Sequence, residues 1–141
     1  MRVLSVTAQK PCSTGSGVYL TEVVRSLAKM GVSQAVVAGV TREDRVDMPE
    51  GVTVYPVYFS SEKLPYPVVG MSDEMPYTST RYRDMTEEMA GQFKAAFLEV
   101  LDEAIEKENP DIILCHHLYY LTALIRAHYP AKKVYGFCHN T

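Results

Sequence analysis

The sequence contains little cysteine, and its cysteines are poorly placed for cross-linking. There are three, Cys12, Cys115 and Cys138. The odd number and wide spacing argue against a disulfide framework and against a zinc ribbon, both of which need closely paired cysteines. We therefore expect free thiols, as in a cytosolic protein.

Long apolar runs and clustered positive charge are missing as well. No stretch approaches the roughly 20 apolar residues that span a bilayer, and residues 1–8 lack the charged-then-apolar layout of a signal peptide. The formal net charge is -3, with Lys and Arg scattered among Asp and Glu, which argues against nucleic acid as the main partner. We expect a cytoplasmic protein without a transmembrane segment, with peripheral attachment to the inner face of the membrane as the alternative.

Two common nucleotide-binding signatures are absent. There is no G-x-x-x-x-G-K-[ST] run and hence no P-loop. The dinucleotide fingerprint needs a third glycine and an acidic residue at the end of the second strand, where this chain has Ala38-Gly39-Val40. A nicotinamide cofactor is therefore disfavoured, and we expect no cofactor.

Short apolar runs alternate with segments of helical period, and 47% of the residues are hydrophobic. The pattern predicts strands at residues 2–7, 35–38, 52–55, 112–115 and 134–138. Near-continuous apolar strands separated by helices are typical of a parallel sheet covered on both faces. With right-handed crossovers, this gives an α/β fold: a Rossmann-like, doubly wound parallel sheet over residues 1–141.

Three helices are expected. Apolar residues from Leu20 to Ala28 form one stripe, which Thr14 or Ser16 is placed to cap and Gly31 to end. A longer helix is predicted to begin with a capping box at Asp84 and Glu87 and to end at Asn109-Pro110, and a short one covers residues 118–128.

Residues 58–84 have no clear period and contain several prolines and tyrosines. A long irregular stretch inside a domain is usually functional or mobile. A tolerated surface insertion is an equally good interpretation.

The expected site lies where the strand order reverses. Open α/β sheets bind ligands at the carboxyl ends of strands beside such a switch point. In the order 3-2-1-4-5, residues 11–17 after the first strand face Cys115-His116-His117 after the fourth. We expect Cys115 to be a buried apolar residue, since nothing indicates the lowered pKa of a nucleophile.

Two groups of residues are candidates for ligand contact. Gly15, Ser16 and Gly17 precede a helix, where N–H groups and the helix dipole favour an anion such as phosphate, although a tight turn also needs glycine. His116 is our candidate catalytic residue, as a proton carrier or hydrogen-bond donor to a hydroxyl substrate, and His117 a substrate-binding one; a packing role is the alternative.

His139 lies after the last predicted strand, at the same edge of the sheet, and is a further candidate for substrate binding. A metal site is not expected, because no nearby acidic group or third histidine completes a ligand set around His116 and His117.

The order of these motifs resembles the amino-terminal domain of retaining GT-B-fold glycosyltransferases, known as glycosyltransferase group 1 or family 4. Leu27-Ala28-Lys29-Met30-Gly31 is similar to the end of the family's first helix. Pro110-Asp111-Ile112-Ile113-Leu114-Cys115-His116-His117 resembles its Pro-Asp-Ile-Ile strand followed by histidine, with Leu114 where another histidine is common. Gly136-Phe137-Cys138-His139-Asn140-Thr141 looks like its next strand and His-Gly-Thr loop, with Asn140 in place of glycine, and residues 65–83 look like one subgroup.

The resemblance implies a function. In that family the amino-terminal domain binds the hydroxyl acceptor, a saccharide or a lipid-linked one, and the carboxy-terminal domain binds the nucleotide-sugar donor. Catalysis takes place in the cleft between them, without a metal. The resemblance places Gly15 and Gly17 near the donor diphosphate and the acceptor, and His116 near the transferred sugar.

The chain departs from the family in length. The paired glutamates and basic residues of the donor domain are absent from the 141 residues. We therefore expect an acceptor-side domain that is inactive alone, either an expressed fragment or a truncated gene, with a sheet edge open to self-association. The alternatives are a fragment of a GT-B-fold epimerase or phosphorylase, and a non-catalytic Rossmann-like binding module.

Overall fold

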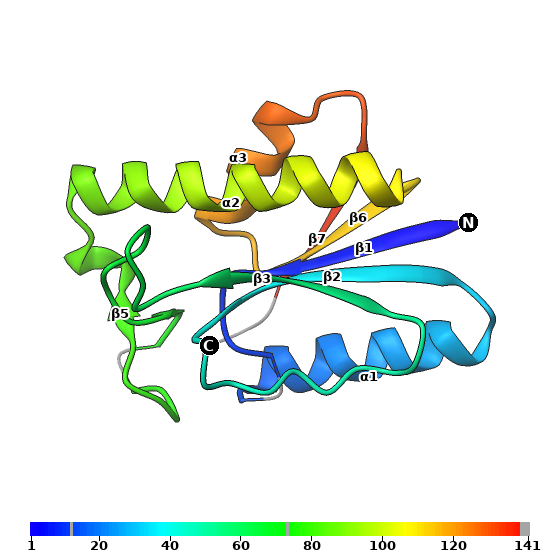
Figure 1. Cartoon of the computed structure of the whole chain (residues 1–141), viewed down its shortest axis with the longest axis horizontal. Helices are drawn as coiled ribbons and strands as arrows, with labels where there is room; N and C mark the ends of the chain where they lie inside the picture. Colours follow the sequence, from blue (N-terminus) through cyan, green and yellow to red (C-terminus); the bar gives the residue numbers. More distant parts are fainter. Residues whose placement is uncertain (12, 73, 139–141) are drawn as a thin grey trace.

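A parallel β-sheet with helices on both faces forms the protein, as the computed structural model shows for residues 1–11, 13–72 and 74–138 (Figure 1). Helix α1 (Gly15–Lys29) covers one face, and α2 (Glu87–Glu108) and α3 (Tyr120–His128) cover the other. The five strands of the sheet are β1 (Arg2–Thr7), β2 (Ser33–Val40), β3 (Thr53–Tyr58), β6 (Ile112–His116) and β7 (Lys133–Phe137). This confirms the predicted Rossmann-like α/β fold.

The strand order is β3-β2-β1-β6-β7, and every neighbouring pair is parallel. The predicted order is therefore correct, and the switch point lies between β1 and β6. β1 is the central strand, and all its residues after Arg2 are therefore buried between strands and helices. β7 is an edge strand whose Tyr135 is 55% exposed.

Helix α1 is capped by hydrogen bonds at both ends. Thr14 is the N-cap, and its side chain accepts a hydrogen bond from the N–H of Gly17. At the other end Gly31 has a φ of 77° and donates to Ala28 O, while Val32 donates to Leu27 O. These bonds form a Schellman motif, which confirms the predicted end at Gly31. The residues predicted as a glycine loop, Gly15 to Gly17, are instead the first turn of the helix.

The predicted start of α2 is wrong by two residues. Thr86 is the N-cap, and it forms a capping box with Met89. Asp84 ends a short 3-10 helix, η1 (Tyr82–Asp84), and binds Arg81 Nε at 2.7 Å. The preference of threonine for capping competes with that of aspartate, and sequence spacing alone did not decide between them. The predicted end is confirmed, with Asn109 in a left-handed conformation at φ 42°.

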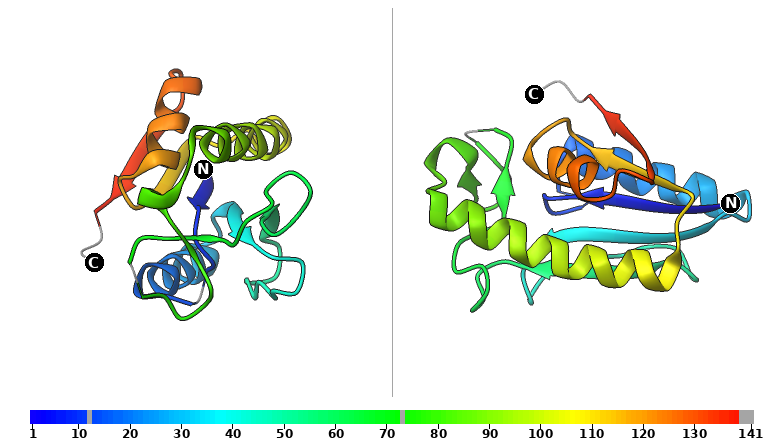
Figure 2. Two further views of the ribbon diagram at one scale, coloured as in Figure 1. Left: turned by 90° about the vertical axis from the view of Figure 1, so that its left-hand side faces the viewer. Right: turned by 90° about the horizontal axis from the view of Figure 1, so that it is seen from above.

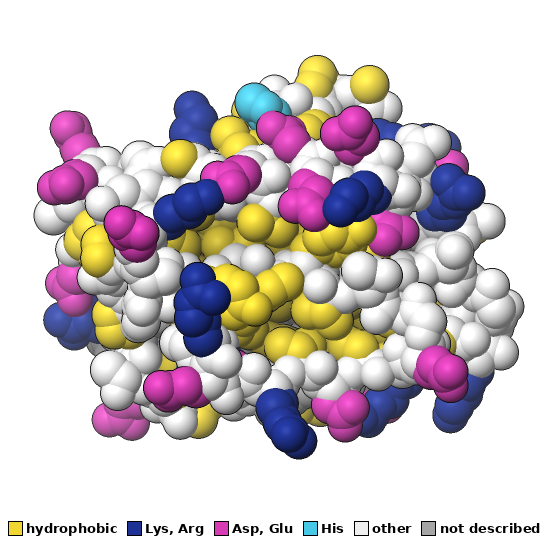
Figure 3. Space-filling model, viewed as in Figure 1, with side chains coloured by type: hydrophobic (Ala, Val, Ile, Leu, Met, Phe, Trp, Pro, Cys, Tyr) yellow, Lys and Arg dark blue, Asp and Glu magenta, His cyan; other side chains and the backbone are white. Residues whose placement is uncertain are grey.

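Strand β3 continues through Pro56, where the sequence had indicated an end at Tyr55. Proline cannot donate to a ladder, but β3 is an edge strand, and β2 is its one partner among the described strands. On this side of the molecule a band of hydrophobic side chains is exposed between charged ones (Figure 3).

Residues 59–85, here called segment 59–85, lie across the carboxyl edge of the sheet (Figure 2). The segment contains a small parallel pair, β4 (Val69–Gly70) with β5 (Thr80–Arg81). Phe59, Leu64 and Val69 are at most 1% exposed and belong to the main core. The segment is therefore not a surface insertion, because part of the core is built from it.

Tyrosine hydroxyls hold segment 59–85 in place. Tyr66 donates to Met89 O at 2.9 Å, and Tyr77 donates to Val69 O at 2.8 Å. Each ring is buried or half-buried and its hydroxyl satisfies a backbone carbonyl. This fixes one wall of the site described next.

Candidate functional site

Three buried polar residues lie at the carboxyl ends of β1 and β6: the predicted His116 and His117, and Gln9, which was not predicted. Gln9 follows β1, His116 is the last residue of β6, and His117 comes next. All three are nearly covered, at 3%, 5% and 6% exposed. Buried polar side chains converging at a switch point are what a ligand site in an open α/β sheet requires.

A small cavity of about 10 Å³ lies among these side chains. It is lined by Ala8, Gln9, Met71, Tyr82, His116, His117, Tyr119, Leu121 and Thr122. This volume is about that of one water-sized probe. The cavity has room for a single hydroxyl group between two histidines and an amide, and we call it the inner cavity.

His116 is held by aromatic rings from two other elements. Its ring stacks on Phe137 of β7, with centroids 4.9 Å apart and planes at 21°. Tyr19 of α1 meets it edge-on at 6.1 Å. Tyr19 also contacts Phe137, at 5.4 Å. The predicted proximity of the start of α1 to His116 is thus made through Tyr19, a contact that the sequence did not indicate.

His117 has an unusual backbone. Its φ of 78° is in the left-handed region, where non-glycine residues are rare. Its N–H donates to Phe137 O at 3.1 Å, and its carbonyl accepts from the Thr122 hydroxyl at 2.6 Å. Backbone held in such a conformation is characteristic of functional sites. The turn directs the His117 side chain into the lining of the inner cavity.

The first turn of α1 is placed differently from the prediction. Gly17 N–H is bonded to Thr14, and the hydroxyls of Thr14 and Ser16 lie 3.0 Å apart. Gly15 is exposed, and a Cβ built on it meets no described atom within 4 Å. Among the described residues around the inner cavity, none belongs to this turn. Any ligand contact with Gly15 is made on its open side.

A second, wider hollow adjoins the inner cavity and opens outward. It has a volume of about 290 Å³ and is lined by Gly70, Met71, Ser72, Arg81, Tyr82, Arg83 and Tyr119. Three of these residues, Met71, Tyr82 and Tyr119, also line the inner cavity. We call it the outer hollow. Together the two spaces make a cleft between the sheet edge and segment 59–85.

Tyr82 is one of the three residues that line both spaces. Its ring lies 4.5 Å from that of Tyr119. Burial first, and then neighbouring tyrosines, raise the pKa of Tyr82 well above its ordinary value. The phenol therefore stays protonated and can donate a hydrogen bond at any physiological pH. The sequence analysis missed Tyr82 and Gln9; the position of Gln9 directly after the first strand was an available signal.

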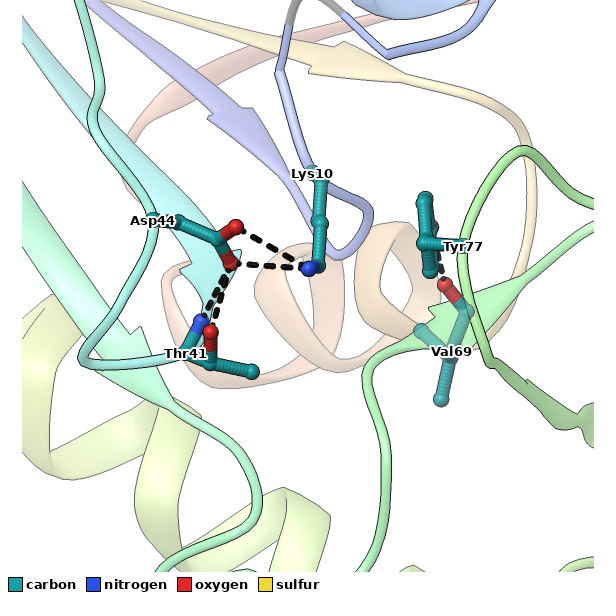
Figure 4. Close-up of polar contacts among 5 residues, drawn as sticks. All are labelled: Lys10, Thr41, Asp44, Val69 and Tyr77. Carbon is teal, nitrogen blue, oxygen red and sulfur yellow. Dashed lines mark hydrogen bonds and ion pairs between the residues drawn. The ribbon is translucent and has the colours of Figure 1, made fainter.

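Lys10 joins three loops beside the cleft (Figure 4). Its amino group lies 3.0 Å from the Asp44 carboxylate and 5.0 Å from the centre of the Tyr77 ring. Burial alone raises the pKa of Asp44, but hydrogen bonds from Thr41 and Lys10 outweigh it and hold the pKa below its ordinary value. Lys10 therefore ties the loop after β1 to the loop after β2 and to segment 59–85.

The other predicted features can be placed as follows. Cys115 is 1% exposed, and burial raises the pKa of its thiol to about 12, which confirms a buried apolar role. Cys12 and His139 lie outside the described residues.

Within residues 1–11, 13–72 and 74–138, no group of three His, Cys, Asp or Glu side chains is arranged to hold a metal. No helix in the same part of the chain is both long enough and apolar enough to cross a membrane.

Compared with known proteins, the chain matches no family model and none of the curated proteins.

Proposed function

We propose that this chain is the acceptor-side domain of a retaining GT-B-type glycosyltransferase, which moves a sugar from a nucleotide-sugar donor to a hydroxyl acceptor. The observation that carries the proposal is the meeting of Gln9, His116 and His117 around one hydroxyl-sized cavity at the switch point. The type of reaction, transfer of a sugar to a hydroxyl group, is inferred from the resemblance of the sequence motifs to that family.

In this proposal His116 binds a hydroxyl of the sugar or acceptor. An imidazole ring offers one donor and one acceptor nitrogen, which suits a hydroxyl partner. The stack on Phe137 and the edge contact with Tyr19 fix the plane of the ring before a ligand arrives. A fixed hydrogen-bonding group favours the transition state, because it needs no reorganisation during the reaction.

The first turn of α1 faces the leaving diphosphate. The positive end of the helix dipole and the open side of Gly15 favour an anion there. The nucleotide-sugar donor and the residues that bind it come from a second domain. The reaction needs both halves of the cleft, so this domain by itself is expected to be inactive.

The test uses the full product of the gene that encodes these residues, assayed for sugar transfer from a panel of nucleotide sugars to hydroxyl acceptors. His116→Phe keeps the aromatic stack and removes both ring nitrogens. We expect it to lower kcat/KM by roughly 10–100-fold, the effect of losing a strong hydrogen bond. His128→Ala, an exposed histidine in the last turn of α3, is the control and should leave transfer unchanged.

Several outcomes would contradict the proposal. Transfer by residues 1–141 alone would remove the need for a second domain. Unchanged kinetics in His116→Phe would exclude His116 from the site. Absence of transfer, with epimerisation or phosphorolysis in its place, would favour the alternative GT-B-fold enzymes, and absence of any turnover would favour a binding module.

A further inference from the structure

Tyr119 is a large aromatic residue that stays half-exposed at the cleft. Its side chain is 47% exposed, and it lines both the inner cavity and the outer hollow. It is the N-cap residue of α3, but its side chain makes no capping hydrogen bond. Serine, threonine, aspartate or asparagine would stabilise the start of the helix better at this position. The capping of α3 therefore does not account for a tyrosine here.

Tyr82 holds the ring of Tyr119 in place. The two ring centroids are 4.5 Å apart, and the ring planes meet at 58°. Tyr82 belongs to η1 in segment 59–85, whereas Tyr119 lies directly before α3, so the pair joins the two sides of the cleft. The contact covers only part of Tyr119, since nearly half of its surface stays exposed. The cleft thus has a positioned aromatic surface that is open to a ligand.

The rest of the outer hollow suits a small, uncharged ligand. Its described lining adds the apolar side chain of Met71 and the hydroxyl of Ser72, a mixture of apolar and a few polar groups that is typical of small-molecule sites. Arg81 and Arg83 also line it. Arg81 Nε donates to Asp84 at 2.7 Å, and Arg83 has interactions of its own within the protein. Neither guanidinium is free, so an uncharged ligand fits this lining better than an anion.

The size of the hollow limits the ligand. Its volume of about 290 Å³ is at the lower end of small-molecule sites, which range from about 300 to 1,000 Å³. It has room for one sugar ring and not for a nucleotide sugar of full length. A pyranose ring carries C–H groups on its faces and hydroxyl groups around its rim. An aromatic ring that covers one face removes apolar surface from water, while polar groups nearby bind the rim.

We propose that the outer hollow is a saccharide subsite, in which a sugar ring of the acceptor stacks on Tyr119 and directs its reacting hydroxyl into the inner cavity. This inference rests on the proposed function, and it adds that the acceptor is a neutral carbohydrate and not a lipid alcohol. Burial raises the pKa of Tyr82, so its phenol stays protonated and donates to another hydroxyl of the same ring.

Binding is measured on the ¹⁵N-labelled protein with the methyl glycosides of glucose, galactose, mannose and N-acetylglucosamine, titrated to high millimolar concentration. We expect saturable shifts of the amide signals of residues 70–72 and 118–122 with at least one glycoside. Tyr119→Ala should weaken this binding about threefold to tenfold, the usual effect of losing one aromatic contact. Tyr119→Phe keeps the ring and should bind as tightly as the wild type.

The controls separate stacking from general effects. Tyr135→Ala should leave binding unchanged, because Tyr135 is a 55% exposed tyrosine of β7 and is not among the described residues that line either space. Sorbitol is the control ligand: it has the hydroxyl groups of a sugar but no ring face, and it should bind more weakly than the glycoside. If Tyr119→Ala does not fold, Tyr119→Leu takes its place, since it keeps an apolar side chain without an aromatic face.

Four results would overturn the proposal. They are the lack of a saturable shift with every glycoside, equal binding by the wild type and the variant without the ring, equal losses in Tyr119→Phe and Tyr119→Ala, and sorbitol binding as tight as that of the glycoside. Binding that needs the ring of Tyr119 and the ring of the sugar supports it.

These readouts do not depend on sugar transfer. A full-length enzyme that transfers sugar to lipid alcohols and not to saccharides would overturn the saccharide subsite and leave the glycosyltransferase proposal intact. Sugar binding that needs Tyr119, in a protein without transfer activity, would do the reverse.

Discussion

The two walls of the cleft are built in different ways. The sheet wall consists of the ends of β1 and β6, and the register Val6↔Cys115 sets the positions of Gln9 and His116. The segment wall consists of residues 70–72 and 81–83, and side chains such as Phe59 and Tyr77 hold it. The comparison shows that a backbone ladder positions one half of the site and side-chain packing the other. Four predictions test this difference.

The largest effect is expected at the anchor of the segment wall. Phe59 is 1% exposed and packs near Tyr66, Phe93 and Phe97, with ring centroids 5.7 to 6.3 Å away. Phe59→Ala should reduce the free energy of unfolding by about 3–5 kcal/mol, because it leaves a cavity in the core. Chemical denaturation measures this, with Met30→Ala, at a residue 76% exposed, as control. A loss below about 1 kcal/mol would show that segment 59–85 packs loosely.

The next largest effect is expected beside the sheet wall, at Gly39 of β2, which packs against the backbone of Ala8 just after β1. A Cβ there lies 2.2 Å from the backbone oxygen of Ala8 and 2.9 Å from Phe59. Gly39→Ala should destabilise the protein by about 1–3 kcal/mol, because a backbone atom has to move.

Gly136→Ala in β7 is the matched substitution for Gly39→Ala. Its Cβ meets the end of the Leu118 side chain, which is 58% exposed and can turn away. We expect a change in the free energy of unfolding below about 1 kcal/mol. Equal losses in the two variants would mean that the steric restriction at Gly39 is relieved elsewhere.

A smaller effect is expected where the two walls are tied together, at Asp44. Asp44→Asn should reduce the free energy of unfolding by about 1 kcal/mol at pH 7, through the loss of its bonds to Lys10 and Thr41. The pKa of Asp44 is lower in the folded state, so its contribution is present above the unfolded value of 3.8 and is lost as the pH falls through the folded value.

The difference between wild type and Asp44→Asn should therefore vanish in acid. Denaturation from pH 7 down to about pH 3 measures it. Glu22→Gln, which breaks the exposed pair with Arg25, is the control and should have little effect at any pH. If the difference in free energy of unfolding between wild type and Asp44→Asn did not depend on pH, the charge of Asp44 would not contribute to its interaction with Lys10.

The smallest effect on stability is expected at Gly15, beside the sheet wall. Gly15→Ala should change the free energy of unfolding by less than about 0.5 kcal/mol, because the site is open and alanine is a good helix former. If a diphosphate approaches the first turn of α1, the same methyl group should weaken donor binding in the full-length enzyme. Gly91→Ala in α2, which is equally open, is the control. Unchanged donor kinetics in Gly15→Ala would remove this turn from the site.

The predictable part of the site is the sheet wall. The alternation of apolar strands and amphipathic helices is a local pattern, and the crossover rule turns it into a strand order. The strand-end positions of His116 and His117 then follow from the order alone, and the same reasoning could have found Gln9. The end of α1 at Gly31 was also predictable from the sequence, because glycine is the residue most favoured in the left-handed conformation that ends a helix.

The segment wall was not predictable from local patterns. Leu64, Val69 and the tyrosines have no regular period, since each is buried by contact with a distant helix or strand. Pairing with β2 likewise explains why β3 continues past the end assigned to it. The error at Asp84 has a local cause, because Thr86 two residues later is also a good capping residue. The role of Tyr82 depends on its packing against Tyr119, which is far away in the sequence.

The sequence by itself determined the order of the elements, the switch point and the histidines that stand beside it, because these depend on residue period and on parallel pairing. The tertiary structure decided the left-handed turn at His117, the stack of His116 on Phe137, and the outer hollow beside Tyr82. Those features arise from contacts between residues that are distant in the chain, and local sequence patterns cannot predict such contacts.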